Sequence, residues 1–92
     1  MSLNRFAKRR DANEEEIVTA LLAEGFDVFK LDKPLDLLVW RKNGVAFAVL
    51  EVKTDVGRTT SDQDDFLRRT TGCPRAIVRT AEEALAAARQ WC

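Results

Sequence analysis

The dipeptide Asn43-Gly44 constrains the fold more than any other feature of the sequence, because it separates two apolar runs, residues 35–41 and 45–53. Asn-Gly between such runs is a strong short-range signal for a β-hairpin with a two-residue loop. This loop would also fix the register of the two strands. The predicted opposed pairs are Lys42 with Val45, Trp40 with Phe47, Leu38 with Val49, and Asp36 with Glu51.

The predicted register brings two carboxylates together. Alternation places Asp36 and Glu51 on one sheet face, with Cβ atoms roughly 4.5–5.5 Å apart. Like charges in this position destabilise a strand pair, whereas a divalent cation between them would reverse the sign of the interaction. Lys53 falls on the same face and could hold a water or a phosphate oxygen. Two acids and a lysine at a strand end suit metal-assisted phosphodiester hydrolysis.

The composition narrows the other possibilities. The chain has no histidine, which excludes a Ser-His-Asp triad, a Cys-His pair and a histidine-containing zinc site within it. Fifteen basic and fifteen acidic residues give zero net charge, so long-range attraction to nucleic acid or to a membrane is not expected. Its 92 residues are enough for one domain.

Apolar periodicity and end signals predict seven elements in this single domain. They are a helix from Asp11 or Asn13 to Gly25, strands over 26–31, 35–41 and 45–53, a helix over 61–71, a strand over 76–79, and a final helix opened by Thr80 and Glu83. The helix over 61–71 can be the crossover between two parallel strands. We therefore predict an α/β domain over residues 11–92, in the order α-β-β-β-α-β-α with a mixed sheet, preceded by a basic arm over residues 1–10. The pair Trp40 and Phe47 is interpreted as core packing.

Each of the first two predicted helices carries a polar residue at the head of its apolar stripe. Glu14 lies in the direction of Leu21, whereas Glu15 and Glu16 fall off that face. Gln63 stands in the same relation to the apolar residues of the second helix. Glu14 could instead interact with the positive end of the helix dipole, and Gln63 could be a simple capping residue.

These residues carry a resemblance to a known family. Asp36, followed fifteen positions later by Glu51-Val52-Lys53 and preceded by Glu14 on a helix, resembles the PD-(D/E)XK nuclease superfamily. Within it the chain is most similar to the stand-alone VRR-NUC (virus-type replication-repair nuclease) group of phages and bacteria, and it also resembles archaeal Holliday junction resolvases. The similarity runs from about residue 13 to residue 84. One departure is Leu35, which stands where the family usually has proline.

The resemblance implies a restriction-endonuclease-like fold and a metal-dependent endonuclease that cuts structured or branched DNA, of Holliday junction or flap type, in replication, repair or recombination. Carried over by position, Asp36 and Glu51 would bind Mg²⁺ or Mn²⁺, assisted by the Val52 carbonyl. Lys53 would orient the attacking water or steady the charge that develops on the phosphate. Glu14 would complete the acidic cluster, with Glu16 as the second choice, and Gln63 would support the site or contact DNA.

Further expectations concern partners and location. Cys73 and Cys92 form neither a disulfide framework nor a metal motif, which favours a reducing, cytoplasmic compartment. The family resemblance implies a bacterial or phage-infected cell. No apolar run is long enough to span a membrane. Basic residues could be solvated surface or a rim that contacts phosphates: Arg5, Lys8, Arg9, Arg10, Arg41, Lys42, Arg58, Arg68 and Arg69. We expect a homodimer. The alternative function is a catalytically inactive DNA-binding or assembly subunit with a helicase or recombination partner.

Overall fold

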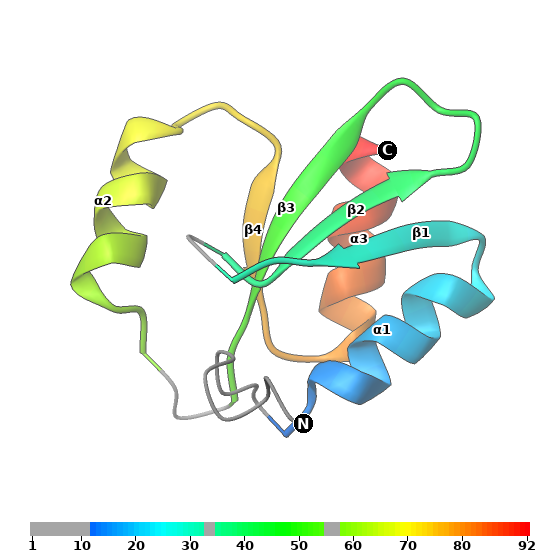
Figure 1. Cartoon of the computed structure of the whole chain (residues 1–92), viewed down its shortest axis with the longest axis horizontal. Coiled ribbons are helices and arrows are strands. Elements are labelled where there is room, and N and C mark those ends of the chain that lie inside the picture. Colours follow the sequence, from blue (N-terminus) through cyan, green and yellow to red (C-terminus); the bar gives the residue numbers. More distant parts are fainter. Residues whose placement is uncertain (1–11, 33–34, 55–57) are drawn as a thin grey trace, which may run out of the picture.

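The computed structural model describes residues 12–32, 35–54 and 58–92, which form three helices and one four-stranded sheet (Figure 1). The predicted order α-β-β-β-α-β-α is confirmed. The predicted arm over residues 1–10, Asp11 and the Lys33-Pro34 interruption lie outside the described residues. The elements are α1 (Glu14–Ala23), β1 (Phe26–Lys30), β2 (Leu37–Arg41), β3 (Phe47–Val52), α2 (Ser61–Arg69), β4 (Arg75–Val78) and α3 (Ala81–Trp91).

The sheet is mixed, with the strand order β1-β2-β3-β4. β1 and β2 are antiparallel, and so are β2 and β3. β4 runs parallel to β3, and α2 lies in the connection between them. The predicted crossover is therefore confirmed. Through this connection the Gln63 side chain of α2 lies within hydrogen-bond distance of Glu51 on β3.

The two faces of the sheet differ in how well they are covered. α1 and α3 pack together against one face, and α2 stands apart from them beside β4 (Figure 1). The core lies between α1, α3 and this covered face. Its strand members are Phe26, Leu37, Val39, Ala48, Leu50, Val52 and Val78, and its main helical members are Ile17, Leu21, Ala84, Ala87 and Ala88. Alternation directs the neighbouring strand residues to the opposite face.

Trp40 and Phe47 lie on that opposite face, which corrects the interpretation of this pair as core. The two residues are opposed, as predicted, but Trp40 is half-buried and Phe47 is exposed. The physical reason is that both long helices lie on the other face. Strand alternation identifies two residues that share a face, but it does not say which face the helices cover.

The hairpin has the predicted register and a wider tip than predicted. Leu38 pairs with Val49 and Trp40 with Phe47, yet the predicted pair of Lys42 and Val45 does not form. A turn closed by the Gly44 N–H and the Arg41 carbonyl (2.8 Å) comes first, and β3 begins three residues later. Asn43 alone of the two loop residues has a positive φ, of 65°. A two-residue type I′ turn would need both residues there.

The helix ends follow the predicted signals with two differences. α1 begins after Asn13, whose side chain makes no capping bond, and Gly25 follows its end with φ 94°. α2 begins at Ser61, as predicted, but its cap is the preceding Thr60, which forms a reciprocal capping box with Gln63. At α3 the Thr80 side chain accepts from the Glu83 N–H, as predicted. Within the described residues no helix is long and apolar enough to cross a membrane.

Candidate functional site

Asp36 lies immediately before β2 and continues the hairpin beyond the regular ladder. Its N–H donates to the Leu50 carbonyl (3.0 Å), and its Oδ2 accepts from the Val52 N–H (2.8 Å). The Asp36 side chain thus takes the place of a backbone acceptor at the end of the strand pair. This bond fixes the Asp36 carboxylate against the backbone between Glu51 and Lys53.

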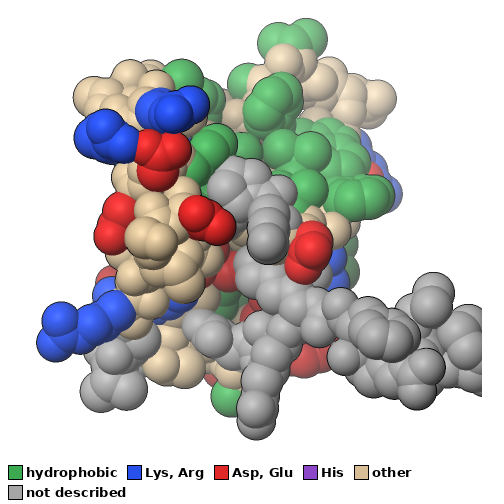
Figure 2. Space-filling model, turned by 60° about the vertical axis from the view of Figure 1, so that its left-hand side comes forward, with side chains coloured by type: hydrophobic (Ala, Val, Ile, Leu, Met, Phe, Trp, Pro, Cys, Tyr) green, Lys and Arg blue, Asp and Glu red, His purple; other side chains and the backbone are tan. Residues whose placement is uncertain are grey.

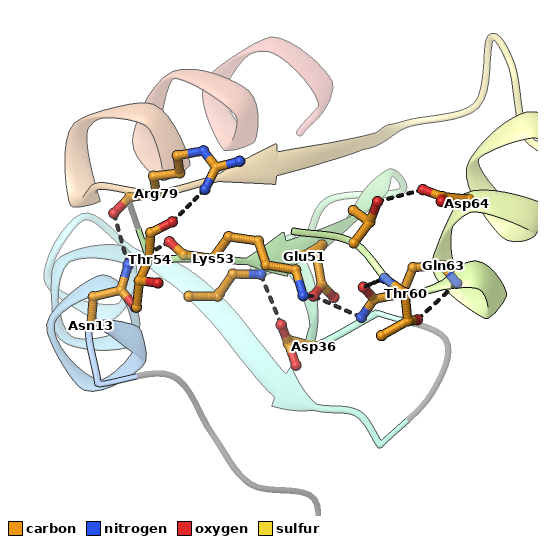
Figure 3. A network of polar contacts seen from close by, with 11 residues as sticks. Asn13, Asp36, Glu51, Lys53, Thr54, Thr60, Gln63, Asp64 and Arg79 are labelled. Carbon is orange, nitrogen blue, oxygen red and sulfur yellow. Dashed lines mark hydrogen bonds and ion pairs between the residues drawn. The ribbon is translucent and has the colours of Figure 1, made fainter. Parts of the chain in front are cut away.

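Glu51 is the centre of the polar cluster at this strand end (Figure 3). Its Oε2 lies 3.0 Å from the Lys53 Nζ and accepts from the Gln63 Nε2 at 2.7 Å. Glu51 and Asp36 are 1% and 4% exposed. The other carboxylate oxygen, Glu51 Oε1, is buried and has no hydrogen-bond partner in the described part of the chain. A buried acceptor without a partner is costly for a folded protein, so this atom points to a ligand.

The electrostatics of Glu51 reflect this burial. Loss of hydration raises the pKa of Glu51 above its ordinary value of 4.5, and the nearby Asp36 carboxylate raises this pKa further. The bond to Lys53 acts in the opposite direction and offsets part of the effect. The two facing carboxylates therefore interact as the predicted register required. The repulsion between the two carboxylates does not stabilise the folded state.

Gln63 joins α2 to the carboxylate site. Its Oε1 accepts from the Thr60 N–H (3.0 Å), while its Nε2 donates to Glu51. One amide therefore serves both as the second half of the capping box and as a ligand of the site. The capping role proposed from the sequence is confirmed, and support of a functional site by Gln63 stays a prediction. Gln63 is the buried residue of α2, at 6% exposure.

The backbone of Lys53 is held on both sides. Its N–H donates to the Val78 carbonyl (3.0 Å), and its carbonyl accepts from the Asn13 Nδ2 (2.9 Å). The same Asn13 amide group donates to the Arg79 carbonyl (2.8 Å), so it links the start of α1 to the ends of β3 and β4. Sequence reasoning saw Asn13 only as a possible cap. Nothing in the sequence pattern signals a bond across 40 positions.

Glu14 lies on the buried stripe of α1, as predicted, with 2% exposure, whereas Glu15 and Glu16 are exposed. Its Oε2 is 4.0 Å from the Nζ of Lys30 on β1. Among residues 12–32, 35–54 and 58–92, no three His, Cys, Asp or Glu side chains are grouped closely enough to hold a metal ion. The described acidic pair is Asp36 and Glu51, and the place of Glu14 in this cluster stays a prediction.

The predicted basic rim is described in part. Arg58 is exposed, just before the capping box of α2. Arg68 and Arg69 are also exposed, but both form ion pairs with Asp65. The Arg69 Nε lies 3.2 Å from the Asp65 Oδ2. This pairing reduces the positive charge that the two arginines present to a ligand. Cys73 and Cys92 are free cysteines, as predicted.

The fold and the cluster define an α/β protein with a mixed four-stranded sheet and a buried, lysine-bound carboxylate pair at a strand end. No family model, curated protein or solved structure matches the chain.

Proposed function

We propose that the chain is a metal-dependent endonuclease of the PD-(D/E)XK type, related to the VRR-NUC and Holliday junction resolvase groups, and that it hydrolyses phosphodiester bonds in structured or branched DNA. The observation that carries the proposal is the buried pair Asp36 and Glu51 with Lys53 bound to it. Repulsion between two facing carboxylates makes the free energy of folding less favourable. A divalent cation is the simplest ligand that would offset this repulsion.

The residues present fit Mg²⁺ or Mn²⁺. Mg²⁺ is usually held by one or two carboxylates and keeps several waters, so two acids suffice. Glu51 Oε1 supplies a buried oxygen with no described hydrogen-bond partner, and the Asp36 carboxylate faces it. Asp36 and Glu51 would hold the ion, and the Val52 carbonyl is the backbone oxygen between them and Lys53. A bound divalent ion would supply Lewis-acid polarisation of the phosphoryl oxygen and a lower pKa for bound water.

The chain's own residues would divide the remaining work. The Lys53 Nζ, 3.0 Å from Glu51, brings a positive charge to the place where a phosphate would approach. The fixed Lys53 backbone limits the positions that this charge can take. Gln63 holds Glu51 by one oxygen and leaves the other oxygen for a ligand. Arg58 is exposed and would contact the DNA backbone.

A second candidate function is a catalytically inactive subunit that keeps the nuclease fold and assembles with a helicase or recombination partner. The intact cluster argues against it. A protein without catalysis gains nothing from two buried carboxylates that repel each other, since replacement of one by glutamine would remove the repulsion.

The two functions are separated by a cleavage assay. The purified protein is offered linear, flapped and four-way DNA with Mg²⁺, Mn²⁺ or EDTA, alongside Glu51→Gln and Lys53→Met. We expect metal-dependent cutting of a branched substrate, reduced by about 10²–10⁴-fold in each variant. The control is Glu15→Gln, an exposed acid on α1, which should cut as the wild type does. Absence of metal-dependent cutting of every substrate would overturn the proposal.

A further inference from the structure

The sheet face that α1 and α3 leave open combines aromatic side chains with the carboxylate site. The strand register and the alternation of side chains give its members. We call this set the open face: the aromatic residues Phe29, Trp40 and Phe47, the aliphatic residues Leu38, Val49 and Ile77, the charged residues Asp27 and Arg75, and the pair Asp36 and Glu51 at one end. Figure 2 shows hydrophobic side chains gathered over the hairpin end of the sheet, in the upper right of the view.

The aromatic members of the open face are in contact with water. Phe29 is 60% exposed and Phe47 54%, and Trp40 is half-buried. Trp40 and Phe47 are opposed across β2 and β3, and together with the hairpin tip they line a shallow apolar hollow. Exposed aromatic rings that are grouped in this way mark a binding surface.

The aromatic residues extend the carboxylate site along the strands. The pair Phe29 and Leu38 lies two residues along β2 from Asp36, and the pair Trp40 and Phe47 lies four residues from it. At about 3.4 Å per residue, these offsets are about 7 Å and 14 Å. Successive phosphates of a stacked DNA strand are about 3.4 Å apart along the helix axis. A strand with one phosphate at the carboxylates therefore reaches the aromatic rings within its next few nucleotides.

Arg75 adds a positive charge beside the carboxylates. It lies opposite Val49, two residues along β3 from Glu51. Its Nε donates to the Thr70 hydroxyl (3.1 Å) and its Nη2 to the Leu67 carbonyl (2.6 Å). Neither acceptor is charged, so these bonds fix the guanidinium without neutralising it. A fixed, half-buried arginine of this kind is suited to a phosphate of the bound strand.

We propose that the open face binds unpaired nucleotides next to the scissile bond, with Phe29, Trp40 and Phe47 as stacking surfaces for their bases and Arg75 as a phosphate contact. The inference rests on the proposed function for the identity of this strand as the substrate. Stacking tolerates any sequence, because every base has a π-face. Flapped DNA supplies such unpaired nucleotides, whereas a fully paired four-way junction does not.

A nucleic-acid strand suits the open face better than a second copy of the chain. Sheet-to-sheet packing of two copies would bury Asp27 and Arg75 and would close the carboxylate site. Burial of these charges would require new partners for both to offset their loss of hydration. A stacked base supplies a partner for Asp27, which lies opposite Trp40, because exocyclic amines of bases donate hydrogen bonds to carboxylates.

The fluorescence of Trp40 tests the inference without any cleavage. The chain has two tryptophans, and Trp91→Phe leaves Trp40 as the reporter on the open face. This protein is titrated in EDTA at low salt with a short oligothymidine, and with an abasic strand of equal length that keeps the phosphates. We expect saturable quenching by oligothymidine and none by the abasic strand. Phe29→Ala and Phe47→Ala, added to this protein, should each raise the dissociation constant by about 5- to 150-fold.

The matched control is Leu22→Ala, which shortens an equally exposed side chain (52%) on α1 and should bind oligothymidine as the Trp91→Phe protein does. Circular dichroism verifies that each variant is folded. Equal quenching by both strands, no quenching by either, or unchanged affinity in both phenylalanine variants would overturn the inference. So would an equal loss of affinity in Leu22→Ala. Base-dependent quenching in a protein that cuts no DNA with metal would instead overturn the nuclease function and leave the stacking surface in place.

Discussion

Glu51 combines three properties that rarely occur together in a residue that only supports a fold. It is buried, it faces a second carboxylate, and one of its oxygens has no described hydrogen-bond partner. Lys53 and Gln63 both bind its other oxygen. The neighbours thus orient Glu51 but leave the hydrogen-bonding capacity of its second oxygen unused. This arrangement is expected of a ligand-binding carboxylate.

The raised pKa of Glu51 gives a first prediction about stability. Because the folded pKa lies above the unfolded one, the contribution of Glu51 to stability is complete below pH 4.5 and is lost as the pH rises through the folded pKa. Glu51→Gln removes this loss. In EDTA, we expect the variant to be more stable than the wild type at pH 8, by on the order of 1 kcal/mol, and the difference to vanish toward pH 4.

Urea unfolding at a series of pH values measures this difference. Glu83→Gln, an exposed acid on α3, is the control and should not change with pH in this way. A Glu51→Gln variant that is less stable than the wild type at pH 8 and equally so at pH 4 would contradict the assigned cause of the pKa shift.

The double role of Gln63 gives a second prediction. Gln63→Glu keeps an acceptor for the capping box but places a carboxylate against Glu51, 2.7 Å from its oxygen. We expect lower metal-free stability at pH 8, by about 1–3 kcal/mol, and recovery on acidification. Thr60→Ala removes the cap alone and should cost about 1 kcal/mol at every pH. Thermal unfolding at pH 5 and pH 8 distinguishes the two variants, and equal pH profiles would refute the bond between Gln63 and Glu51.

The sequence predicted single residues best where a local pattern determined them. The burial of Glu14 and Gln63 followed from helical periodicity, and the opposition of Asp36 and Glu51 followed from the Asn-Gly turn. The role of Asn13 could not be predicted, because its partners Lys53 and Arg79 are distant in sequence. The distance from Glu14 to the two acids could not be predicted either, because strand and helix patterns do not fix the distance between a helix side chain and a strand end.

At the scale of elements, α1 is attached to the sheet by more than its apolar stripe. Asn13 donates two hydrogen bonds to the carbonyls that end β3 and β4, where these parallel strands separate. The start of α1 is thus hydrogen-bonded to the strand end that carries Lys53. This explains why Asn13 makes no capping bond to its own helix.

The third prediction tests this attachment. Asn13→Asp preserves the size of the side chain but replaces the two donors by a carboxylate facing two carbonyls. We expect a loss of about 2–4 kcal/mol at pH 8 for Asn13→Asp and of about 1–3 kcal/mol for Asn13→Ala. Urea unfolding measures both losses. If Asn13→Asp were as stable as the wild type, the two bonds would not hold α1 to the strand ends.

The elements themselves were predicted well because their signals are local. The hairpin register, the parallel crossover and the seven elements were confirmed. At the hairpin tip the predicted pairing of Lys42 with Val45 was wrong. Gly44 explains the wider tip in part, since a Cβ there would lie 2.9 Å from the Arg41 carbonyl oxygen. The placement of Trp40 and Phe47 on the sheet face away from α1 and α3 depended on where these helices pack, which is a property of the whole chain.

At the scale of the molecule, zero net charge is the sum of unlike regions. Buried acids lie at the strand end, and Arg58 is exposed nearby in the chain, before α2. A divalent ion would offset the acids locally. With the proposed nuclease function, we expect modest DNA affinity that depends on metal, rather than tight nonspecific binding.

The fourth prediction concerns this charge distribution. With Mn²⁺ present, Arg58→Ala should weaken DNA binding of the slowly cutting Lys53→Met protein and lower the slope of log affinity against log salt by about 1. The control is Arg89→Ala, since Arg89 is bound to Glu24 between α1 and α3. Fluorescence anisotropy over a salt series measures both. Equal effects of the two substitutions would remove Arg58 from the proposed DNA surface.

The central claim, that Asp36 and Glu51 form a divalent-cation site, is tested most directly by calorimetric titration of Mn²⁺ into the metal-free protein. We expect one bound ion per chain in the wild type and in Glu15→Gln, and no measurable binding in Asp36→Asn or Glu51→Gln. Wild-type protein that binds no Mn²⁺, or variants that bind it as the wild type does, would contradict the claim.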